Sequence, residues 1–317
     1  MVSRSVLGIG GCLLILCEFS MAAGGDEPPK AAQPKAAGPK VTFEQDIVYS
    51  KIGSSELKLD LARPAEGEGL IPVIVVIHGG AWRGGNKSDV RAISSEFVRR
   101  GYATVAPQYR FCPKDPFPAQ VHDVKAAVRW VKSNAKKYRI DPDRVGAIGF
   151  SAGGHLALFL GLTGPNDGLE GDVAAGAPDS RVRAVVNYFG PTDLAAQDIP
   201  DVSKPLVKDF LGGSPQEKPE AAAKASPLTF VSKDDAPILT FQGTKDPLVP
   251  FTQAIKLAEA MNTAGVPGRV ELLVGAQHGW AGAELERTVD ETFRFFDRYL
   301  GKADEAGKRK DEPRPSK

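Results

Sequence analysis

Apolar residues are arranged in two different patterns along this chain. Residues 73–77 (VIVVI) and 145–150 (VGAIGF) are short apolar runs, which are typical of strands covered on both faces. Residues 119–137 instead repeat valine and alanine at spacings of three and four, which indicates the apolar stripe of a helix. The first pattern predicts strands at 45–49, 57–62, 73–77, 103–106, 145–150, 182–189, 238–242 and 270–274. The second predicts helices at 88–100, 119–137, 152–162, 252–264 and 284–300.

The order of these elements predicts an α/β fold. Only a short turn, Gly53-Ser54-Ser55, separates the first two strands, so we expect them to form an antiparallel hairpin. Strands and helices alternate afterwards, which predicts a mostly parallel, eight-stranded sheet with helices on both faces. Residues 191–232 break the alternation with several prolines between short apolar pieces, and we expect them to form a small cap insertion over the sheet.

The two ends of the chain show neither the strand pattern nor the helix pattern of the residues between them. Residues 1–23 place Arg4 before an apolar stretch and small residues after it, the layout of a signal peptide; an uncleaved anchor is the alternative. Residues 24–42 are rich in Pro, Ala and Lys and are expected to form a linker. Residues 302–317 are expected to form a polar tail. We therefore expect an exported protein, periplasmic or extracellular, with one folded domain at 43–301 and no membrane span after cleavage.

Composition narrows the possible functions. The chain of 317 residues has 40 basic and 39 acidic side chains, so it lacks the basic surplus of a general nucleic-acid binder. Of its three cysteines, Cys12 and Cys17 lie in the predicted signal peptide, which leaves Cys112 without a partner for a disulfide. No spaced Cys and His residues suggest a metal site, and we expect neither a metal nor an organic cofactor.

The segment Gly149-Phe150-Ser151-Ala152-Gly153 carries the first sign of chemistry. It matches the pattern G-x-S-x-G and lies between a predicted strand and a predicted helix. A sharp turn in that setting presents a serine hydroxyl as a nucleophile, and the helix N-terminus below it favours developing negative charge. Ser151 is therefore the candidate nucleophile.

A serine nucleophile needs a base, which is oriented in turn by an acid. His278 follows the last predicted strand and Asp246 follows the strand before it, so both lie where open α/β sheets place their sites. The chain order Ser151, Asp246, His278 is that of an α/β-hydrolase triad. Asp193 is the rival acid, but it follows an earlier strand, and we expect it to fix a loop or contact substrate. His155 is expected to be packed rather than catalytic.

A second glycine-rich segment, His78-Gly79-Gly80-Ala81-Trp82, follows the strand predicted at 73–77. Glycines let backbone N–H groups approach an oxyanion closely, so we expect an oxyanion hole formed by Gly79, Gly80 and Ala81 together with Ala152. His78 is then expected to shape the loop. The candidate walls of the substrate pocket are Trp82, Tyr109 and Trp280.

Taken in order, these motifs resemble the esterase and lipase branch of the α/β-hydrolases. The resemblance covers about residues 45–300 and is greatest to secreted bacterial carboxylesterases, including feruloyl-esterase-like and acetylxylan-esterase-like members related to hormone-sensitive lipase. It rests on His78-Gly79-Gly80-Ala81-Trp82, Tyr109-Arg110, Pro116-Phe117-Pro118-Ala119, Gly149–Gly154, Gly243–Asp246 and Gln277-His278-Gly279.

The resemblance implies an α/β-hydrolase domain that hydrolyses small or carbohydrate-linked carboxylic esters through an acyl-enzyme, without a cofactor. The HGGxW form of the first motif also resembles kynurenine formamidases, so a formamidase, amidase or peptidase-like hydrolase using the same triad stays an alternative. A hydrolase fold that only binds its ligand is the remaining possibility.

Overall fold

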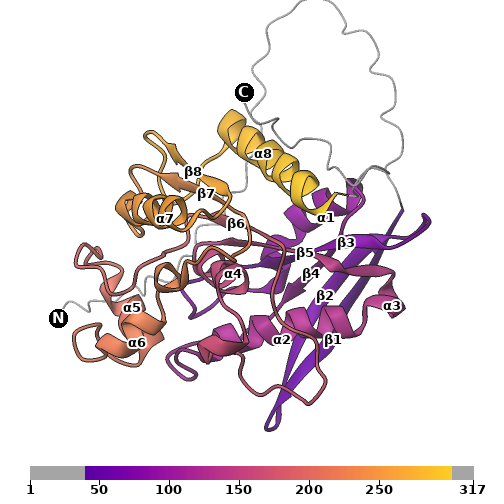
Figure 1. The fold of residues 1–317 in the computed structure, drawn as a ribbon, viewed down its shortest axis with the longest axis horizontal. Coiled ribbons are helices and arrows are strands. Elements are labelled where there is room, and N and C mark those ends of the chain that lie inside the picture. Colours follow the sequence, from indigo (N-terminus) through magenta and orange to yellow (C-terminus); the bar gives the residue numbers. More distant parts are fainter. Residues whose placement is uncertain (1–39, 302–317) are drawn as a thin grey trace, which may run out of the picture. The chain divides into compact units, whose positions relative to one another are not determined.

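One eight-stranded sheet organises residues 40–301, the part of the chain that the computed structural model describes (Figure 1). Its strands follow the order β1-β2-β4-β3-β5-β6-β7-β8, and every pair from β4 to β8 is parallel. β1 and β2 form an antiparallel hairpin, and β2 also pairs antiparallel with β4. The strands are β1 (Val41–Ile52), β2 (Ser55–Pro64), β3 (Ile71–Ile77), β4 (Ala103–Pro107), β5 (Ile140–Phe150), β6 (Ala184–Tyr188), β7 (Ile238–Gly243) and β8 (Gly268–Leu273). The predicted fold class is confirmed.

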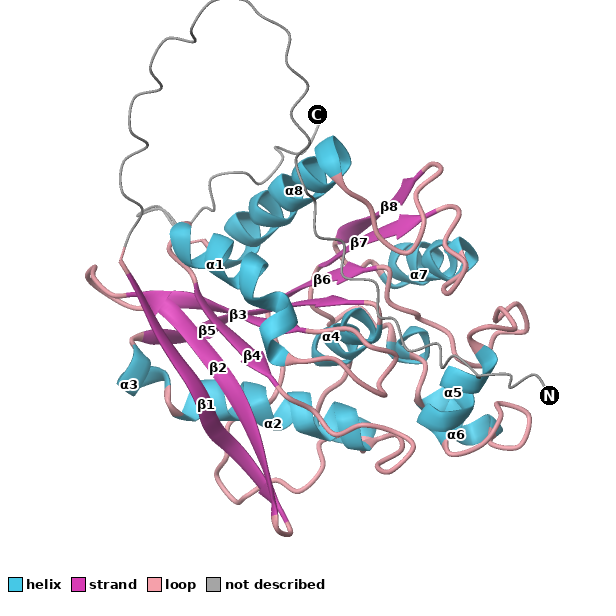
Figure 2. Ribbon diagram, turned by 180° about the vertical axis from the view of Figure 1, so that it is seen from behind, coloured by secondary structure: helices cyan, strands magenta, loops and turns pink. Residues whose placement is uncertain are grey.

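Helices cover both faces of the sheet, because side chains along the central strands alternate between two apolar cores. Ile74 and Val76 of β3 face the core under α1 (Arg91–Arg99) and α8 (Gly282–Leu300). Val73 and Val75 face the core under α2 (Ala119–Ser133), α4 (Ala152–Leu162) and α7 (Phe251–Ala264). Figure 2 shows α1 and α8 on one side of the sheet and α2 on the other.

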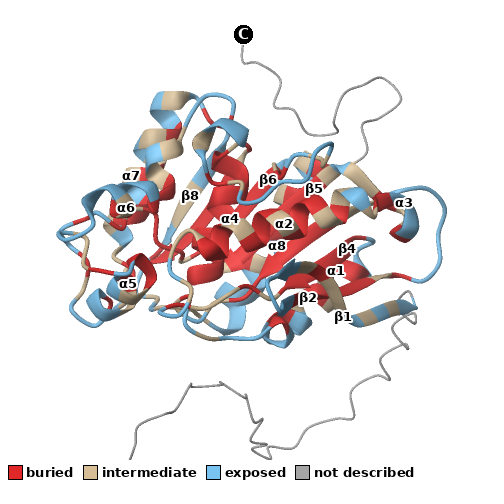
Figure 3. Cartoon of the chain, turned by 90° about the horizontal axis from the view of Figure 1, so that it is seen from below, coloured by how far each residue is buried: buried red, intermediate tan, exposed pale blue. Residues whose placement is uncertain are grey.

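Helix α4 is the most deeply placed of these elements. All of its residues are buried, and it lies in the centre of the buried region in Figure 3. Gly161 allows this close approach, since a Cβ at that position would lie 2.5 Å from Cγ2 of Val185 in β6. The helix begins directly after Ser151, so the candidate nucleophile lies at the N-terminus of a fully buried helix.

Several predicted boundaries differ from the structure. The linker predicted at 24–42 is too long, because Val41 and Thr42 already pair with Pro64 and Arg63 of β2. The helix predicted at 119–137 is divided at Asn134 into α2 and the short α3 (Ala135–Tyr138). The predicted signal peptide at 1–23, most of the linker and the tail at 302–317 lie outside the described residues.

Residues 191–232, predicted to form the cap, connect β6 to β7. They contain α5 (Lys204–Leu211), α6 (Pro219–Lys224) and the single 3₁₀ turn η3 (Pro227–Phe230), joined by loops. Two further 3₁₀ turns, η1 (Lys87–Val90) and η2 (Pro165–Asp167), lie elsewhere in the fold. Within residues 40–301, no helix combines the length and apolar character needed to cross a membrane.

Candidate active site

Ser151 occupies a strained turn between β5 and α4. Its backbone has φ 54° and ψ −120°, a conformation that few non-glycine residues adopt. The N–H of Ser151 donates to the carbonyl of Tyr188 at 2.9 Å, which ties the turn to β6. Glycine is required on both sides: a Cβ on Gly149 would lie 2.0 Å from the carbonyl oxygen of Gly153, and one on Gly153 would lie 2.2 Å from that of Ile77.

The structure brings Ser151, His278 and Asp246 into one hydrogen-bonded chain. His278 follows β8, and its Nε2 lies 2.9 Å from Oγ of Ser151. Its Nδ1 lies 2.8 Å from Oδ2 of Asp246, which follows β7. A carboxylate only accepts hydrogen bonds, so Nδ1 carries the ring proton and Nε2 is left to accept the serine proton. The side chain of Asp246 is fully buried and that of His278 is 18% exposed.

Asp246 is held by four donors. Its Oδ1 accepts the N–H groups of Leu248 at 2.8 Å and Val249 at 3.0 Å, and its Oδ2 accepts Nε2 of Gln242 at 2.9 Å as well as His278. Burial raises the pKa of Asp246, but the bonds from His278 and the two backbone N–H groups outweigh it and leave the pKa below its usual value. Sequence analysis missed Gln242, which stands in β7 among apolar residues without any motif around it.

The rival acid, Asp193, points its carboxylate elsewhere. Its Oδ2 pairs with Nζ of Lys256 at 2.8 Å, and its Oδ1 accepts the N–H of Ala195 at 3.1 Å. Gln253 fixes the same loop by accepting the N–H groups of Thr192 and Asp193 through Oε1. Asp193 therefore fixes the start of the 191–232 segment.

The loop after β3, here called the glycine loop (residues 78–85), lies against the nucleophile turn. Gly80, Ala81 and Trp82 adopt successive positive φ values of 114°, 52° and 57°. A Cβ on Gly79 would lie 3.4 Å from Cβ of Ser151, so the loop and the nucleophile are in contact. Within residues 40–301, the N–H groups of all four predicted donors, Gly79, Gly80, Ala81 and Ala152, have no hydrogen-bond acceptor. Free donors beside a serine nucleophile are what an oxyanion hole requires.

With this geometry described, sequence comparison identifies the family. The BD-FAE family model matches residues 59–261, which is more than half of the chain. The chain belongs to the BD-FAE family. Together with the esterases to which the chain is similar, this match confirms the predicted resemblance to α/β-hydrolase esterases.

Individual relatives of this BD-FAE protein are also named as esterases. The probable carboxylic ester hydrolase LipM of Mycobacterium tuberculosis is 35% identical over 222 residues, which are 66% of this chain and 49% of LipM. A truncated carbohydrate esterase from gut microbiota has 30% identity and a TM-score of 0.69, covering 82% of this chain and 99% of its own. Esterase 2 of Thermogutta terrifontis, phosphorylated by paraoxon, has 27% identity and a TM-score of 0.66, covering 85% and 97%. The chain spans about half the length of the curated relatives it matches.

His78 and Tyr109 support the glycine loop of this BD-FAE protein from behind. Nδ1 of His78 donates to the carbonyl of Gly79 at 2.7 Å, and its ring stacks on Tyr109 at 4.4 Å. Burial lowers the pKa of His78, which keeps the ring neutral. The hydroxyl of Tyr109 donates to the carbonyls of His78 and Gly79, and the residue is only 2% exposed. The structure thus places Tyr109 in the core, not on the pocket wall that was predicted for it.

Trp82 joins the glycine loop to two other parts of the site. Its Nε1 donates to Nδ1 of His155 in α4 at 3.2 Å, and its ring stacks on Phe210 of α5 at 4.2 Å. Nε2 of His155 then donates to the carbonyl of Ala225 at 2.8 Å. Burial lowers the pKa of His155 to about 4, so the ring is neutral and packed, as its position in the sequence suggested. Trp82 also lines a small apolar cavity.

Trp280 is connected to the triad through the ring of Phe189. Its indole N–H donates to Oγ1 of Thr288 at 2.9 Å, and its ring packs edge-on against Phe189 at 5.4 Å. Phe189 in turn packs against the ring of His278 at 4.7 Å. Trp280 therefore supports the residue that contacts the base. Sequence analysis missed Phe189, although its place directly after β6, at the same end of the sheet as the triad, pointed to it.

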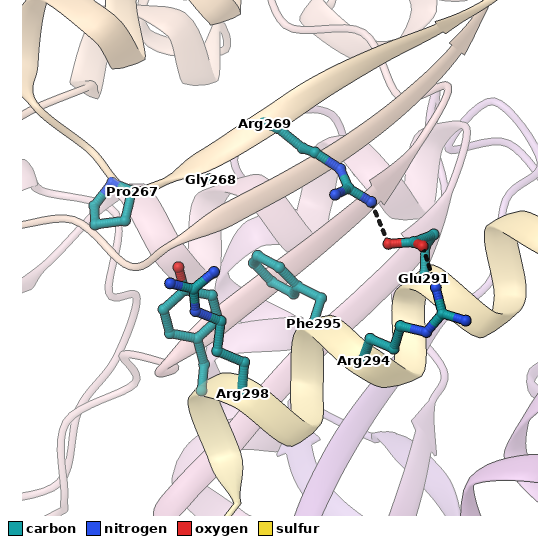
Figure 4. A pocket seen from close by; sticks show the side chains of 8 residues that line it. Pro267, Gly268, Arg269, Glu291, Arg294, Phe295 and Arg298 are labelled. Atoms are coloured by element: carbon teal, nitrogen blue, oxygen red, sulfur yellow. Dashed lines mark hydrogen bonds and ion pairs between the residues drawn. The ribbon is translucent and has the colours of Figure 1, made fainter. Parts of the chain in front are cut away.

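A cavity of about 460 Å³ lies between β8 and α8, away from the triad (Figure 4). Arg269 and Arg294, on its wall, are paired with Glu291. No triad residue lines this cavity, so it is separate from the candidate active site. No group of three or more His, Cys, Asp or Glu side chains within residues 40–301 is arranged to hold a metal ion.

Proposed function

We propose that this BD-FAE protein is a serine carboxylesterase that works through an acyl-enzyme. The observation that carries the proposal is the hydrogen-bonded chain from Ser151 through His278 to Asp246 beside unpaired backbone N–H groups. The esterase names of its relatives support the same reaction class.

The proposed reaction has two halves. Oγ of Ser151 attacks the ester carbonyl carbon while its proton passes to Nε2 of His278, and Asp246 stabilises the imidazolium that forms. The N–H groups of Gly79, Gly80, Ala81 and Ala152 are the donors available to the developing oxyanion. The tetrahedral intermediate then expels the alcohol, which takes the proton from Nε2 and leaves an acyl group on Ser151. Water, deprotonated by His278, attacks this acyl-enzyme and releases the carboxylic acid.

We further propose that the substrates are small or carbohydrate-linked esters. The carbohydrate esterase among the solved relatives supports a sugar as the alcohol. The same triad would also serve amide hydrolysis, so an acetate ester and the matched acetanilide should be compared. Faster turnover of the anilide would favour the amidase alternative.

The direct test replaces the nucleophile. Ser151→Ala should lower turnover of 4-nitrophenyl acetate by about 10³-fold or more. It should also abolish labelling by a fluorophosphonate, which intact mass detects as one adduct on the unsubstituted protein. Ser95→Ala in α1, whose hydroxyl only bonds within its own helix, is the matched control and should keep both properties. Full activity in Ser151→Ala would overturn the proposal, and labelling without turnover would favour a binding role.

We also propose export as the cellular destination. Arg4 and the apolar stretch at 6–17 support it. Fractionation of expressing cells, with the mass of the recovered chain, tests it: a chain shortened near residue 23 outside the cytoplasm is expected, and a full-length cytoplasmic chain would contradict it.

A further inference from the structure

The base of the triad is hydrogen-bonded at two opposite ends of its ring. Nδ1 of His278 is bonded to Asp246 at 2.8 Å, and Nε2 is bonded to Ser151 at 2.9 Å. These two bonds define a line between the acid and the nucleophile, but they leave the imidazole free to tilt about that line. A further contact, made beside the line, is needed to fix the tilt of the ring.

Phe189 makes such a contact. Its ring centroid lies 4.7 Å from that of His278, with 58° between the ring planes. Phe189 is itself packed against three other rings, those of Phe150, Tyr188 and Trp280, at 6.3, 6.1 and 5.4 Å. A ring enclosed in this way cannot easily move aside, so it holds the imidazole in place.

The backbone of Phe189 adopts a conformation that is unfavourable for its side chain. Its φ of 44° lies in the left-handed region, which few non-glycine residues occupy. The N–H of Phe189 donates to the carbonyl of Phe241 in β7 at 2.8 Å, and the N–H of Gly190 donates to Oδ1 of Asn187 at 2.9 Å. A Cβ on Gly190 would lie 2.5 Å from the backbone N of His155, so the chain is packed against α4 here. Strain held so firmly is concentrated at functional sites.

The residue before Phe189 holds the nucleophile. The carbonyl of Tyr188 accepts the N–H of Ser151 at 2.9 Å. Tyr188 and Phe189 therefore contact the nucleophile through the backbone and the base through a side chain. Ser151 follows β5 and His278 follows β8, which are separated in the sheet by β6 and β7. The end of β6 thus aligns two groups between which a proton must pass.

We propose that Phe189 is a positioning residue that holds the imidazole of His278 at the tilt required for proton transfer to the leaving alcohol. Once Ser151 has given up its proton and attacked the substrate, Nε2 must turn its proton toward the leaving oxygen. The hydrogen bond to Asp246 and the packing of Phe189 then hold the ring. This inference rests on the proposed esterase function.

Esters whose alcohols differ in their need for a proton test the proposal. The 4-nitrophenolate ion leaves without a proton, whereas the ethoxide of ethyl acetate must receive one from Nε2 of His278 as the C–O bond breaks. Phe189→Leu keeps an apolar side chain but removes the ring. It should raise the ratio of kcat/KM for 4-nitrophenyl acetate to that for ethyl acetate by about tenfold or more. A merely structural loss would lower both values in the same proportion.

Two further variants serve as controls. Phe295→Leu is the matched control, since Phe295 is half-buried in α8 and packs against Phe296 and Tyr299, away from the triad. It should leave the ratio unchanged. Phe189→Tyr retains the ring and should keep the ratio of the unsubstituted protein.

A second variant tests the same contact without changing Phe189. Trp280→Leu removes one of the rings that enclose Phe189 and leaves Phe189 itself intact. It should raise the ratio by a smaller factor than Phe189→Leu, and it tests the proposal even if Phe189→Leu folds poorly.

The outcomes separate this proposal from the esterase function on which it rests. Equal losses for the two esters in Phe189→Leu and Trp280→Leu, or no loss for either ester, would overturn the positioning role and leave the esterase function intact. A rise of the ratio in Phe295→Leu as large as that in Phe189→Leu would overturn it as well. Absence of any Ser151-dependent hydrolysis would instead overturn the esterase function.

Discussion

The indole nitrogen of Trp82 donates a 3.2 Å hydrogen bond to Nδ1 of His155, which joins the glycine loop to the helix behind the nucleophile. The bond requires a neutral imidazole, because Nδ1 must accept. The other ring nitrogen donates to the carbonyl of Ala225, so one buried histidine links three segments that are distant in sequence.

Acid should weaken this link. His155 has a pKa of about 4 in the folded protein because it is buried, whereas an exposed histidine has about 6.5. The unfolded chain therefore binds more protons between these values, so the free energy of unfolding should fall as pH drops from about 6.5 to about 4. Across this range we expect the protonation of His155 to lower the free energy of unfolding by about 3 kcal/mol.

Urea unfolding of the unsubstituted protein and of His155→Gln, at pH values of about 7, 5.5 and 4.5, measures this pH-dependent change in the free energy of unfolding. Other titrating groups are common to both proteins, so the difference between their pH profiles isolates His155. The variant should show the flatter profile, and parallel profiles would contradict the prediction.

The hydrogen bonds to Asp246 predict that losing the carboxylate lowers activity more than losing one of its donors. Asp246→Asn should retain the fold but lose about 10³-fold to 10⁴-fold in kcat, because it favours the wrong tautomer of His278. Gln242→Leu removes one donor to Oδ2, together with the hydrogen bond from Nε2 to the carbonyl of Val249, and should cost about tenfold in kcat. Gln45→Leu, an exposed glutamine in β1, is the control and should match the unsubstituted protein. A Gln242→Leu loss as large as that of Asp246→Asn would mean that the glutamine does more than position the acid.

The nucleophile turn should not tolerate a larger residue at Gly153. Gly153→Ala would place Cβ 2.2 Å from the carbonyl oxygen of Ile77, so the helix or strand must shift, at a cost of about 3 kcal/mol. At Gly164 the nearest atom to an added Cβ is 3.8 Å away, so Gly164→Ala is the matched control. Thermal and urea unfolding should show a large loss for the first variant and little change for the second; equal stability would contradict the packing argument.

A buried ion network between α2 and the loop that follows α4 and η2 gives the largest predicted stability difference. Nζ of Lys125 and Nη1 of Arg129 each lie 2.7 Å from the carboxylate of Glu170, and the Lys125 side chain is fully buried. Glu170→Ala leaves two cations without their partner and should cost about 3–5 kcal/mol in urea unfolding. Glu56→Ala, which breaks an exposed pair with Lys51, should change little. Similar losses in both variants would contradict the role of burial.

The sheet and the triad were predictable because each has a local signal. Buried strands such as β3 and β5 are short apolar runs, and Ser151 is marked by glycines at fixed positions. The supporting residues have no such signal. Lys125 lies on the apolar face of α2, and its burial depends on Glu170, which is far along the chain. The prediction that Tyr109 lines the substrate pocket was wrong for the same reason. Its hydroxyl donates to the backbone carbonyl of His78 inside the core, and no sequence motif marks that contact.

The division between sheet and insertion has a consequence for how this protein can diversify. Ser151, Asp246 and His278 follow strands of one sheet, whereas the 191–232 segment connects β6 to β7. The residues that make the hydrogen bonds of the triad and of the strained serine turn all lie outside that segment. We therefore expect substitutions in this segment to change substrate preference more readily than they change the chemistry at Ser151.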